Sequence, residues 1–246
     1  MTATNFVRDA TSAQILRAAD LAKRYGEESA ISDVTFSVSA GEVLGIVGPN
    51  GAGKTTLLEI VAGLVAADSG GISWRGRDLR APRRKEAMFY LPDGVRPYQD
   101  RFVIDVFSFF ASVYGRSKAE VAAIVTALEL APVLRKRVST LSKGYNRRLI
   151  LAVGLLTPQP LLLMDEPFDG FDLRQTRNII DVIRDEATKG RTFVLAIHQL
   201  ADAERVCDRF ILLAAGRVRG IGTLDALRTQ TGMPGGSLEE IFLALT

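Results

Sequence analysis

The segment with the clearest chemistry runs from Gly48 to Thr55 and reads GPNGAGKT. It fits the phosphate-binding pattern G-x-x-x-x-G-K-[ST] at every position. Glycines let the backbone curl so that successive N–H groups point at one anion, and a helix beginning near Lys54 adds the positive end of its dipole. We expect Lys54 to reach the β and γ phosphates of a nucleotide, where it is also a catalytic candidate, and the Thr55 hydroxyl to bind Mg²⁺. The expected nucleotide-binding residues here are Gly48, Pro49, Asn50, Gly51, Ala52, Gly53, Lys54, Thr55 and Thr56.

Two adjacent acids end an apolar run, Leu161–Met164, that we expect to be a buried strand. Neighbouring carboxylates in an apolar setting repel each other and resist burial, which a bound Mg²⁺ would relieve. We expect Asp165 to bind that metal together with Thr55, and Glu166 to be the catalytic general base that polarises the attacking water. The plainer alternative is a strand followed by an exposed acidic loop.

His198 is the only histidine in the sequence, and it directly follows an expected strand, Thr192–Ile197. Ligands of parallel sheets bind at the carboxyl edge of the strands, which is where this placement puts it. We expect His198 to be catalytic, in contact with the γ-phosphate and the attacking water. A lone histidine is otherwise more often a structural residue.

The elements needed to position these groups follow from hydrophobic periodicity. Ile31–Val38 nearly alternates apolar and polar residues, as a half-buried strand does, and Val43–Val47 is apolar throughout, as a strand buried on both faces is. Strands alternating with helices predict an α/β fold with a parallel core sheet. The other expected elements are a strand at 15–21, a helix at 54–65, short strands within 71–91, mostly helix over 103–157, helices at 173–188, 200–206, 223–229 and 237–245, and strands at 210–213 and 217–220.

Bulk composition excludes several classes of protein. The 246 residues are 47% hydrophobic and 24% charged, which fits a globular protein with a sizeable core. The net charge of +3 lacks the strong basic stripe of a nucleic-acid reader, so no nucleic-acid partner is expected. No run approaches the ~20 apolar residues of a membrane-spanning helix. If the chain serves a membrane, we expect it to act from outside the bilayer.

Taken together, these motifs resemble the nucleotide-binding domain of ABC transporters over nearly the whole chain. The specific sign is Leu141-Ser142-Lys143-Gly144-Tyr145, which is similar to the family signature LSGGQ and precedes a basic helix. We call these five residues the signature segment. The resemblance implies a P-loop NTPase parallel-sheet core with an N-terminal antiparallel β subdomain and an inserted α-helical subdomain. It implies one domain over 1–246, with core segments 14–92 and 160–230, a helical subdomain at about 93–159 and a C-terminal helix at about 237–245.

The resemblance also implies roles for residues outside the phosphate loop. Tyr25 matches the aromatic residue that stacks on adenine, and Asp172 matches the closing Asp of the loop after the catalytic Glu, at the dimer contact. Ser142, Lys143 and Gly144 would bind the γ-phosphate of ATP held by the opposite subunit.

The sequence departs from the family pattern at three places. Lys143 and Tyr145 replace the usual Gly and Gln of the signature, in a form that occurs in exporter-like branches of the family. Asp93 occupies the position of a loop Gln, where we expect it to contact the metal and to take part in coupling to the partner. Asp169-Gly170-Phe171 replaces Ser-Gly-Leu, which affects contact across the dimer.

The resemblance implies an ATP-binding and ATP-hydrolysing transporter subunit of exporter type. It would use ATP and Mg²⁺, form a homodimer or a heterodimer with another such subunit, and drive a separate transmembrane permease subunit from the cytoplasmic face of the membrane. A soluble ATPase of the same family acting on ribosomes or DNA is the main alternative. A non-hydrolysing binding module and an unrelated P-loop kinase or GTPase remain as further alternatives.

Overall fold

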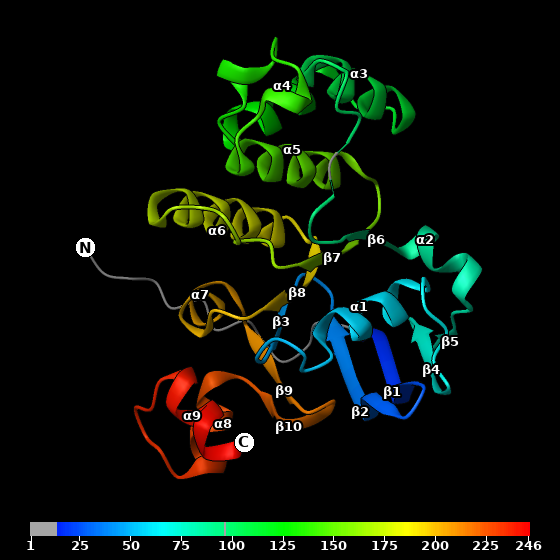
Figure 1. The fold of residues 1–246 in the computed structure, drawn as a ribbon, viewed down its shortest axis with the longest axis vertical. Coiled ribbons are helices and arrows are strands. Elements are labelled where there is room, and N and C mark those ends of the chain that lie inside the picture. Colours follow the sequence, from blue (N-terminus) through cyan, green and yellow to red (C-terminus); the bar gives the residue numbers. More distant parts are fainter. Residues whose placement is uncertain (1–13, 96) are drawn as a thin grey trace.

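A parallel sheet forms the centre of the protein in the computed structural model, which describes residues 14–95 and 97–246. Within these residues the strand order is β10-β9-β3-β8-β7-β6. All neighbouring pairs are parallel except β9 and β10 (Figure 1). The strands are β3 (Val43–Val47), β6 (Met88–Leu91), β7 (Leu161–Asp165), β8 (Thr192–Ile197), β9 (Arg209–Ala214) and β10 (Arg217–Gly222).

The central strands are apolar because both of their faces are covered. Successive side chains of a strand point to opposite faces. In β8, Phe193 and Leu195 pack into the core on the helical side, whereas Val194 packs into the core shared with the phosphate-loop helix. The prediction from the unbroken apolar runs is therefore confirmed for β3, β7 and β8, each of which is buried along its whole length.

A second, antiparallel sheet with the order β2-β1-β4-β5 lies beside the phosphate-loop helix α1 (Figure 1). Its long strands pair from Gln14 with Ser39 to Tyr25 with Glu28, so that the hairpin end carries Tyr25. The predicted α/β class with this N-terminal sheet is confirmed. The elements are β1 (Gln14–Tyr25), β2 (Glu28–Ser39), α1 (Lys54–Ala62), β4 (Ser69–Trp74) and β5 (Arg77–Asp78).

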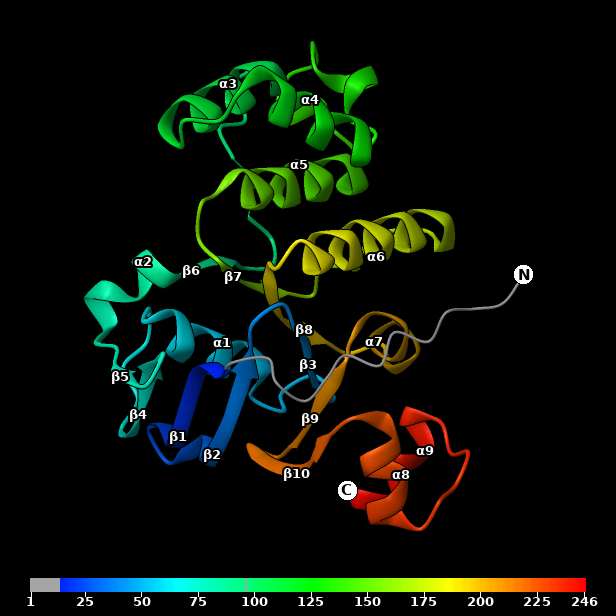
Figure 2. The same cartoon turned by 180° about the vertical axis from the view of Figure 1, so that it is seen from behind.

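Helices between β6 and β7 stack away from the sheet, with α5 above α6 and with α3 and α4 beyond α5 (Figures 1 and 2). Their outer position leaves α5 between the sheet-packed α6 and the outer pair. The limits that we predict for the subdomains stay a prediction. The helices between β6 and β7 are α3 (Val103–Val113), α4 (Lys118–Ala127) and α5 (Lys143–Leu156). The helices that follow β7 are α6 (Leu173–Thr188), α7 (Leu200–Val206), α8 (Leu224–Thr231) and α9 (Leu238–Leu245).

Two local expectations were wrong. The helix expected at 54–65 ends at Ala62, because Gly63 adopts a left-handed φ of 82° and its N–H caps the last turn. The segment 71–91 holds strands but also α2 (Arg84–Ala87), which follows a 3₁₀ turn at Ala81–Arg83 that has Pro82 in its first turn. Arg83 pairs with Glu86 at 3.0 Å across that turn, a short-range contact that the strand pattern did not anticipate.

No helix within residues 14–95 and 97–246 has the length and apolar character needed to cross a membrane.

We expect the stability of the fold to depend on the buried faces of β8. Leu195→Ala removes a side chain that is fully buried in the helical-side core, and we expect a loss of about 2–5 kcal/mol in the free energy of unfolding. The matched control is Leu243→Ala on α9, where the side chain is 71% exposed and a change within about 0.5 kcal/mol is expected. Denaturant unfolding of both variants checks this, and equal losses would contradict it.

Candidate functional site

Three parallel strands end side by side, and each is followed by a residue expected to do chemistry. Val47 pairs with Ile197, and Asp165 pairs with Ala196 on the other side of β8. The register therefore puts the phosphate loop after β3, the acids at the end of β7 and His198 after β8 at one edge. This is the edge of a parallel sheet at which ligands bind.

The phosphate loop depends on two glycines, Gly53 for its left-handed backbone and Gly48 for the close approach of a neighbouring strand. Gly53 caps helix α1 with φ at 100°, and an added Cβ there would lie 2.5 Å from the carbonyl oxygen of Ala30. A Cβ at Gly48 would lie 2.1 Å from the carbonyl oxygen of Leu213. The loop therefore leads directly into α1, which begins at Lys54. The free N–H groups at the N-terminus of a helix form an anion-binding site.

The Lys54 ammonium is buried among the acceptors of this loop. Its Nζ donates to the carbonyl oxygens of Gly48 at 2.8 Å and Pro49 at 3.2 Å, and lies 3.5 Å from Glu166 Oε1. The side chain is 6% exposed. A buried cation with neutral carbonyl partners can exchange them for phosphate oxygens, which are charged and stronger acceptors.

Thr55 and Asp165 meet as expected for a metal pair. The Thr55 hydroxyl donates to Asp165 Oδ2 at 2.7 Å, while Asp165 Oδ1 is buried and has no hydrogen-bond partner among the described residues. Burial raises the pKa of Asp165, the Thr55 hydrogen bond opposes this, and the charge of Glu166 adds to the rise. A buried carboxylate oxygen without a partner, next to a hydroxyl, fits a hard cation such as Mg²⁺.

The same residues do not form an all-protein metal site. Within the described part of the chain, no group of three or more His, Cys, Asp and Glu side chains could hold a metal ion. Mg²⁺ usually binds through one or two protein oxygens together with substrate phosphates, so the Thr55–Asp165 pair is the arrangement expected for an ion that arrives with a nucleotide.

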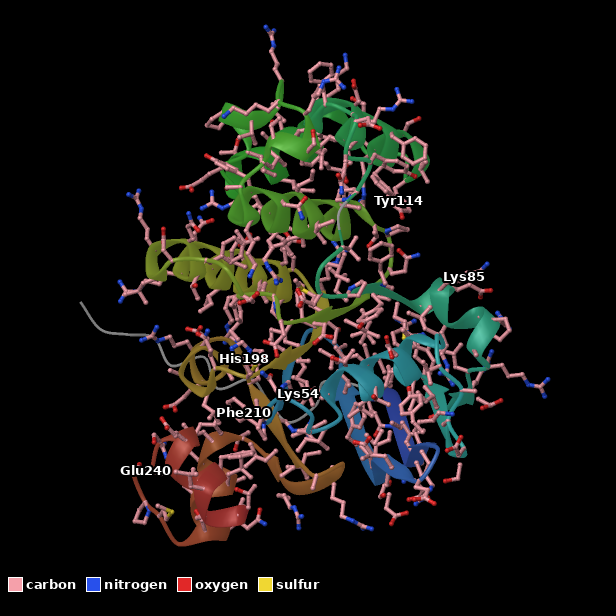
Figure 3. All side chains as sticks on the ribbon, viewed as in Figure 1. Lys54, Lys85, Tyr114, His198, Phe210 and Glu240 are labelled. Atoms are coloured by element: carbon pink, nitrogen blue, oxygen red, sulfur yellow. The ribbon has the colours of Figure 1, made fainter. Side chains whose placement is uncertain are left out.

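Glu166 is held on its side-chain end by His198. His198 Nδ1 lies 2.5 Å from Glu166 Oε2, and the backbone N–H of His198 donates to the same oxygen at 3.3 Å. Glu166 has a left-handed φ of 48°, a conformation that costs a residue with a side chain about 1–3 kcal/mol. Figure 3 shows Lys54 and His198 near each other at the centre of the molecule. Both contact the Glu166 carboxylate, Lys54 at Oε1 and His198 at Oε2.

Lys54, Thr55, Asp165 and Glu166 line one cavity of about 840 Å³, in the size range of about 300–1,000 Å³ typical of ligand sites. Gly48, Pro49 and His198 are not among the described residues that line it. Tyr25, at the end of β1, is 50% exposed and lines the cavity, as an aromatic platform for a base must. The cavity is also lined by Asn50, Gly51, Ala52, Gly53, Lys54, Thr55, Thr56, Asp93, Asp165 and Glu166.

The signature segment lies elsewhere. Ser142, Lys143 and Gly144 are absent from the described residues that line the nucleotide-sized cavity. Ser142 caps helix α5, where its Oγ accepts from the N–H of Tyr145 at 3.3 Å, and it lines a separate polar hollow together with Asp172. Asp172 caps α6, with its Oδ1 accepting from the N–H of Gln175 at 2.8 Å. Two capped helix N-termini, α5 and α6, therefore flank this hollow.

The charged departures meet charges of the same chain. Lys143 Nζ donates to Asp169 Oδ2 at 2.7 Å, and Asp93 Oδ1 accepts from Arg147 Nη2 at 2.5 Å. The expected role of Asp93 as a metal contact stays a prediction, although its carboxylate is already engaged by an arginine. The expected contact of Lys143 with a partner's phosphate also stays a prediction, and it would require the lysine to leave Asp169.

Arg147 and Tyr90 are site residues that the motifs did not reveal. Arg147 donates to the carbonyl oxygen of Glu166 at 2.8 Å, and its spacing of four from Lys143 on an expected helix was the available signal. The hydroxyl of Tyr90 is buried without a partner among the described residues, and Tyr90 lines the cavity. Burial raises its pKa, and the charge of Asp165 adds to this.

We expect Asp165→Asn to stabilise the nucleotide-free protein. A carboxyl whose folded-state pKa is raised loses stability as pH rises through that pKa, because its charged form is buried. The amide still accepts from Thr55, so the variant should have a higher Tm at pH 7, and the gain should vanish as pH falls toward the ordinary pKa of an aspartate. Thermal unfolding from pH 4 to 8 checks this, with Asp181→Asn on the exposed side of α6 as control. A Tm difference that is constant with pH would contradict it.

Comparison with known proteins agrees with this site. The sequence profile of the family described as ABC transporter matches residues 31–169. An uncharacterized ABC transporter ATP-binding protein of Methanocaldococcus jannaschii is 30% identical over 214 residues, which span 85% of this chain and 78% of that protein. The Nod factor export ATP-binding protein I of Rhizobium etli is 35% identical over 206 residues, 80% of this chain and 65% of that protein.

A solved structure described as an ATP binding subunit of an ABC transporter superposes with a TM-score of 0.85 at 32% sequence identity. It covers 94% of this chain and 99% of its own. The profile match takes in the phosphate loop, the signature segment and the acids after β7, and it spans more than half of the sequence. The chain therefore belongs to the ABC transporter family, as an ATP-binding subunit of the kind whose ATPase activity is coupled to transport.

Proposed function

We propose that the chain is the ATP-hydrolysing subunit of an exporter and that two copies, or one copy and a related subunit, close around ATP to drive a separate transmembrane subunit at the cytoplasmic face of a membrane. The observation that carries the proposal is the separation of two half-sites. Lys54 and Glu166 line one cavity, and His198 contacts Glu166, whereas Ser142 is absent from the described lining of that cavity and caps α5 at its N-terminus.

Hydrolysis follows from the groups around Glu166. On ATP binding, Lys54 exchanges its carbonyl partners for phosphate oxygens, and the curled backbone of the phosphate loop donates to the same anion. Glu166 stays oriented by His198 and takes a proton from water as the water oxygen attacks the γ-phosphorus. The bond from the γ-phosphorus to the bridging oxygen breaks, so that ADP and inorganic phosphate leave.

Mg²⁺ would be held by the Thr55 hydroxyl and Asp165. When bound there it would neutralise phosphate charge in the transition state. The unpartnered Oδ1 of Asp165 and the adjacent hydroxyl support this assignment. In the same way, Tyr25 at the cavity wall supports stacking on the adenine ring.

A single chain encloses a triphosphate from one side only. The N-terminus of α5, capped by Ser142, is an anion site that is absent from the described lining of the chain's own cavity, and a Cβ at Gly144 would lie 3.2 Å from Gln175 Oε1. A second copy placed with this N-terminus over the first cavity would complete the enclosure, with Asp172 at the same face. ATP then acts as the ligand that biases an open and closed dimer equilibrium.

The exposed apolar face of α3 supports contact with a membrane subunit. Phe109 and Val113 are 53% and 58% exposed and lie four residues apart, on one side of the helix. Tyr98 packs edge-on against Phe109 at 6.3 Å between ring centroids, so the three form one patch. Contiguous exposed apolar surface marks an interaction site. Figure 3 shows Tyr114, at the end of α3, well away from Lys54 and His198.

The similarity to a Nod factor export ATP-binding protein supports the export direction. The signature form with Lys143 and Tyr145 points the same way, through the exporter-like branch that it resembles.

We expect Glu166→Gln to abolish turnover and to trap a dimer. Loss of a general base lowers kcat by about 100-fold or more, whereas ATP is still bound because Lys54 and the phosphate loop are intact. Size-exclusion chromatography with light scattering, with and without Mg-ATP, measures the trapped dimer. The matched control is Glu166→Gln combined with Ser142→Arg, which should bind ATP and stay monomeric. A Glu166→Gln variant that remains monomeric and hydrolyses ATP at the normal rate would refute the proposed function.

We expect Phe109→Asp to detach the permease while sparing catalysis. A charge in the centre of the α3 patch opposes apolar docking, but the residue lies outside the cavity that holds the catalytic groups. Co-purification with the membrane subunit should be lost, and the ATPase rate of the isolated subunit should stay within about twofold. Leu64→Asp, at a residue 67% exposed just beyond α1, is the control and should keep the permease. Retained co-purification of Phe109→Asp would contradict this docking face.

A further inference from the structure

We propose that Arg147 is a positioning residue for Glu166 and that it links the catalytic carboxylate to helix α5, whose N-terminus, about one turn away from Arg147, is expected to meet the partner's nucleotide. The inference rests on the proposed function and deepens it. It concerns how the two half-sites of one chain are connected.

Arg147 joins three segments at one guanidinium group. Its Nη1 donates to the carbonyl oxygen of Glu166 at 2.8 Å. Its Nη2 donates to Asp93 Oδ1 at 2.5 Å and to Asp169 Oδ2 at 2.9 Å. The Arg147 side chain is 15% exposed, whereas the side chains of Asp93 and Asp169 are 49% and 37% exposed, so the guanidinium is the buried partner of these pairs. The loops after β6 and β7 and the helix α5 are therefore tied at one point.

The tie acts on a residue that has little freedom elsewhere. The N–H of Glu166 donates to the carbonyl oxygen of Ala196 at 3.0 Å, and the side chain is engaged by His198. Its left-handed φ of 48° persists only where the surroundings hold it. The bond from Arg147 fixes the peptide group on the far side, so Glu166 is held at its N–H, its carboxylate and its carbonyl.

An arginine fits this position because its donors form a rigid planar fork. One nitrogen can serve the carbonyl oxygen while the other serves two carboxylates, whereas a lysine ammonium is a single point of charge on a flexible stem. Lys143, one turn earlier on α5, adds a second cation at Asp169, and the Lys143 hydrogen bond is the main cause of the lowered pKa of that carboxyl. The loop after β7 is thus held by two cations on one face of the same helix.

The consequence is mechanical coupling inside one chain. Ser142 caps the N-terminus of α5, and Arg147 lies about one helical turn further along. Any shift of α5 when Ser142 meets the ATP of the partner moves the guanidinium that holds Glu166. Hydrolysis of a chain's own ATP then depends on whether the same chain has engaged the opposite ATP.

The test compares Arg147→Lys and Arg147→Gln with Arg184→Gln. Arg184 is a matched control, because it also joins a carboxylate, Asp208 at 2.7 Å, to a backbone carbonyl, Val206 at 3.1 Å, yet contacts no catalytic residue. We measure kcat, KM for ATP, the Hill coefficient for ATP, and Tm in the same preparations.

For both Arg147 variants we expect kcat to fall by about tenfold or more, in line with the cost of slight misplacement of a catalytic group. We expect KM to stay within about twofold and the Hill coefficient to move toward 1. Arg184→Gln should change Tm at most. If Arg147→Gln does not fold, Arg147→Lys carries the test. The proposal is overturned if a folded Arg147 variant keeps kcat within about twofold, if its loss lies in KM, or if Arg184→Gln loses activity equally.

One further preparation separates this inference from the proposed function. Arg147→Gln combined with Glu166→Gln should still bind Mg-ATP and form the trapped dimer, because Arg147 acts on the position of Glu166 and not on the phosphates. If Glu166→Gln alone forms the dimer but the Arg147 variants turn over normally, only the positioning role fails. If Glu166→Gln forms no dimer, the proposed function itself fails.

Discussion

The structure depends on three strands that are buried on both faces and end at one edge. β3, β7 and β8 have no solvent-facing side, so their register is fixed from both sides, and a slip by one residue would move large apolar groups from one core into the other. That register places the phosphate loop, Asp165–Glu166 and His198 within reach of one another. The proposed catalytic arrangement is thus a consequence of core packing, and the loops only have to turn in the right direction.

The edge that results carries opposing charges in close quarters. Asp165 and Glu166 are adjacent, and Asp93 lies on the same cavity. The charges of both neighbours raise the pKa of Asp165, in addition to its burial. Lys54 and Arg147 supply the balance from opposite sides, one from the phosphate loop and one from α5. The repulsion between these carboxylates favours the binding of a cation and lowers the stability of the folded protein when no cation is bound. A loss of stability at the residues needed for activity is common in enzymes.

The candidate site residues could be predicted from the sequence where a short local motif specifies the residue types that the chemistry needs. The sequence singles out the phosphate loop, the acids at the end of an apolar strand and the lone histidine as candidates, because their expected chemistry depends on local order along the chain. Their roles stay predictions. Arg147 could not be predicted as a site residue, because its hydrogen-bond partners are 19, 22 and 54 residues away in sequence. The short helix α2 escaped because the charged residues Arg84-Lys85-Glu86 show no apolar period, and its formation depends on the preceding Pro82 turn.

The two charged departures from the family pattern are best understood together. A glycine and a glutamine are neutral, and neither would attract its neighbours strongly. Here a lysine and an aspartate stand at these positions, and each finds an opposite charge within the chain, Lys143 at Asp169 and Asp93 at Arg147. Because Arg147 also contacts Asp169, both pairs belong to one network. A carboxylate at position 93 without Arg147 would add repulsion to a site that already holds two acids, so the arginine makes the aspartate tolerable. As a consequence, Asp93 must break its ion pair with Arg147 before it can contact another group. The same ion pair joins the loop after β6 to α5, so α5 cannot move freely without either carrying that loop along or breaking the pair.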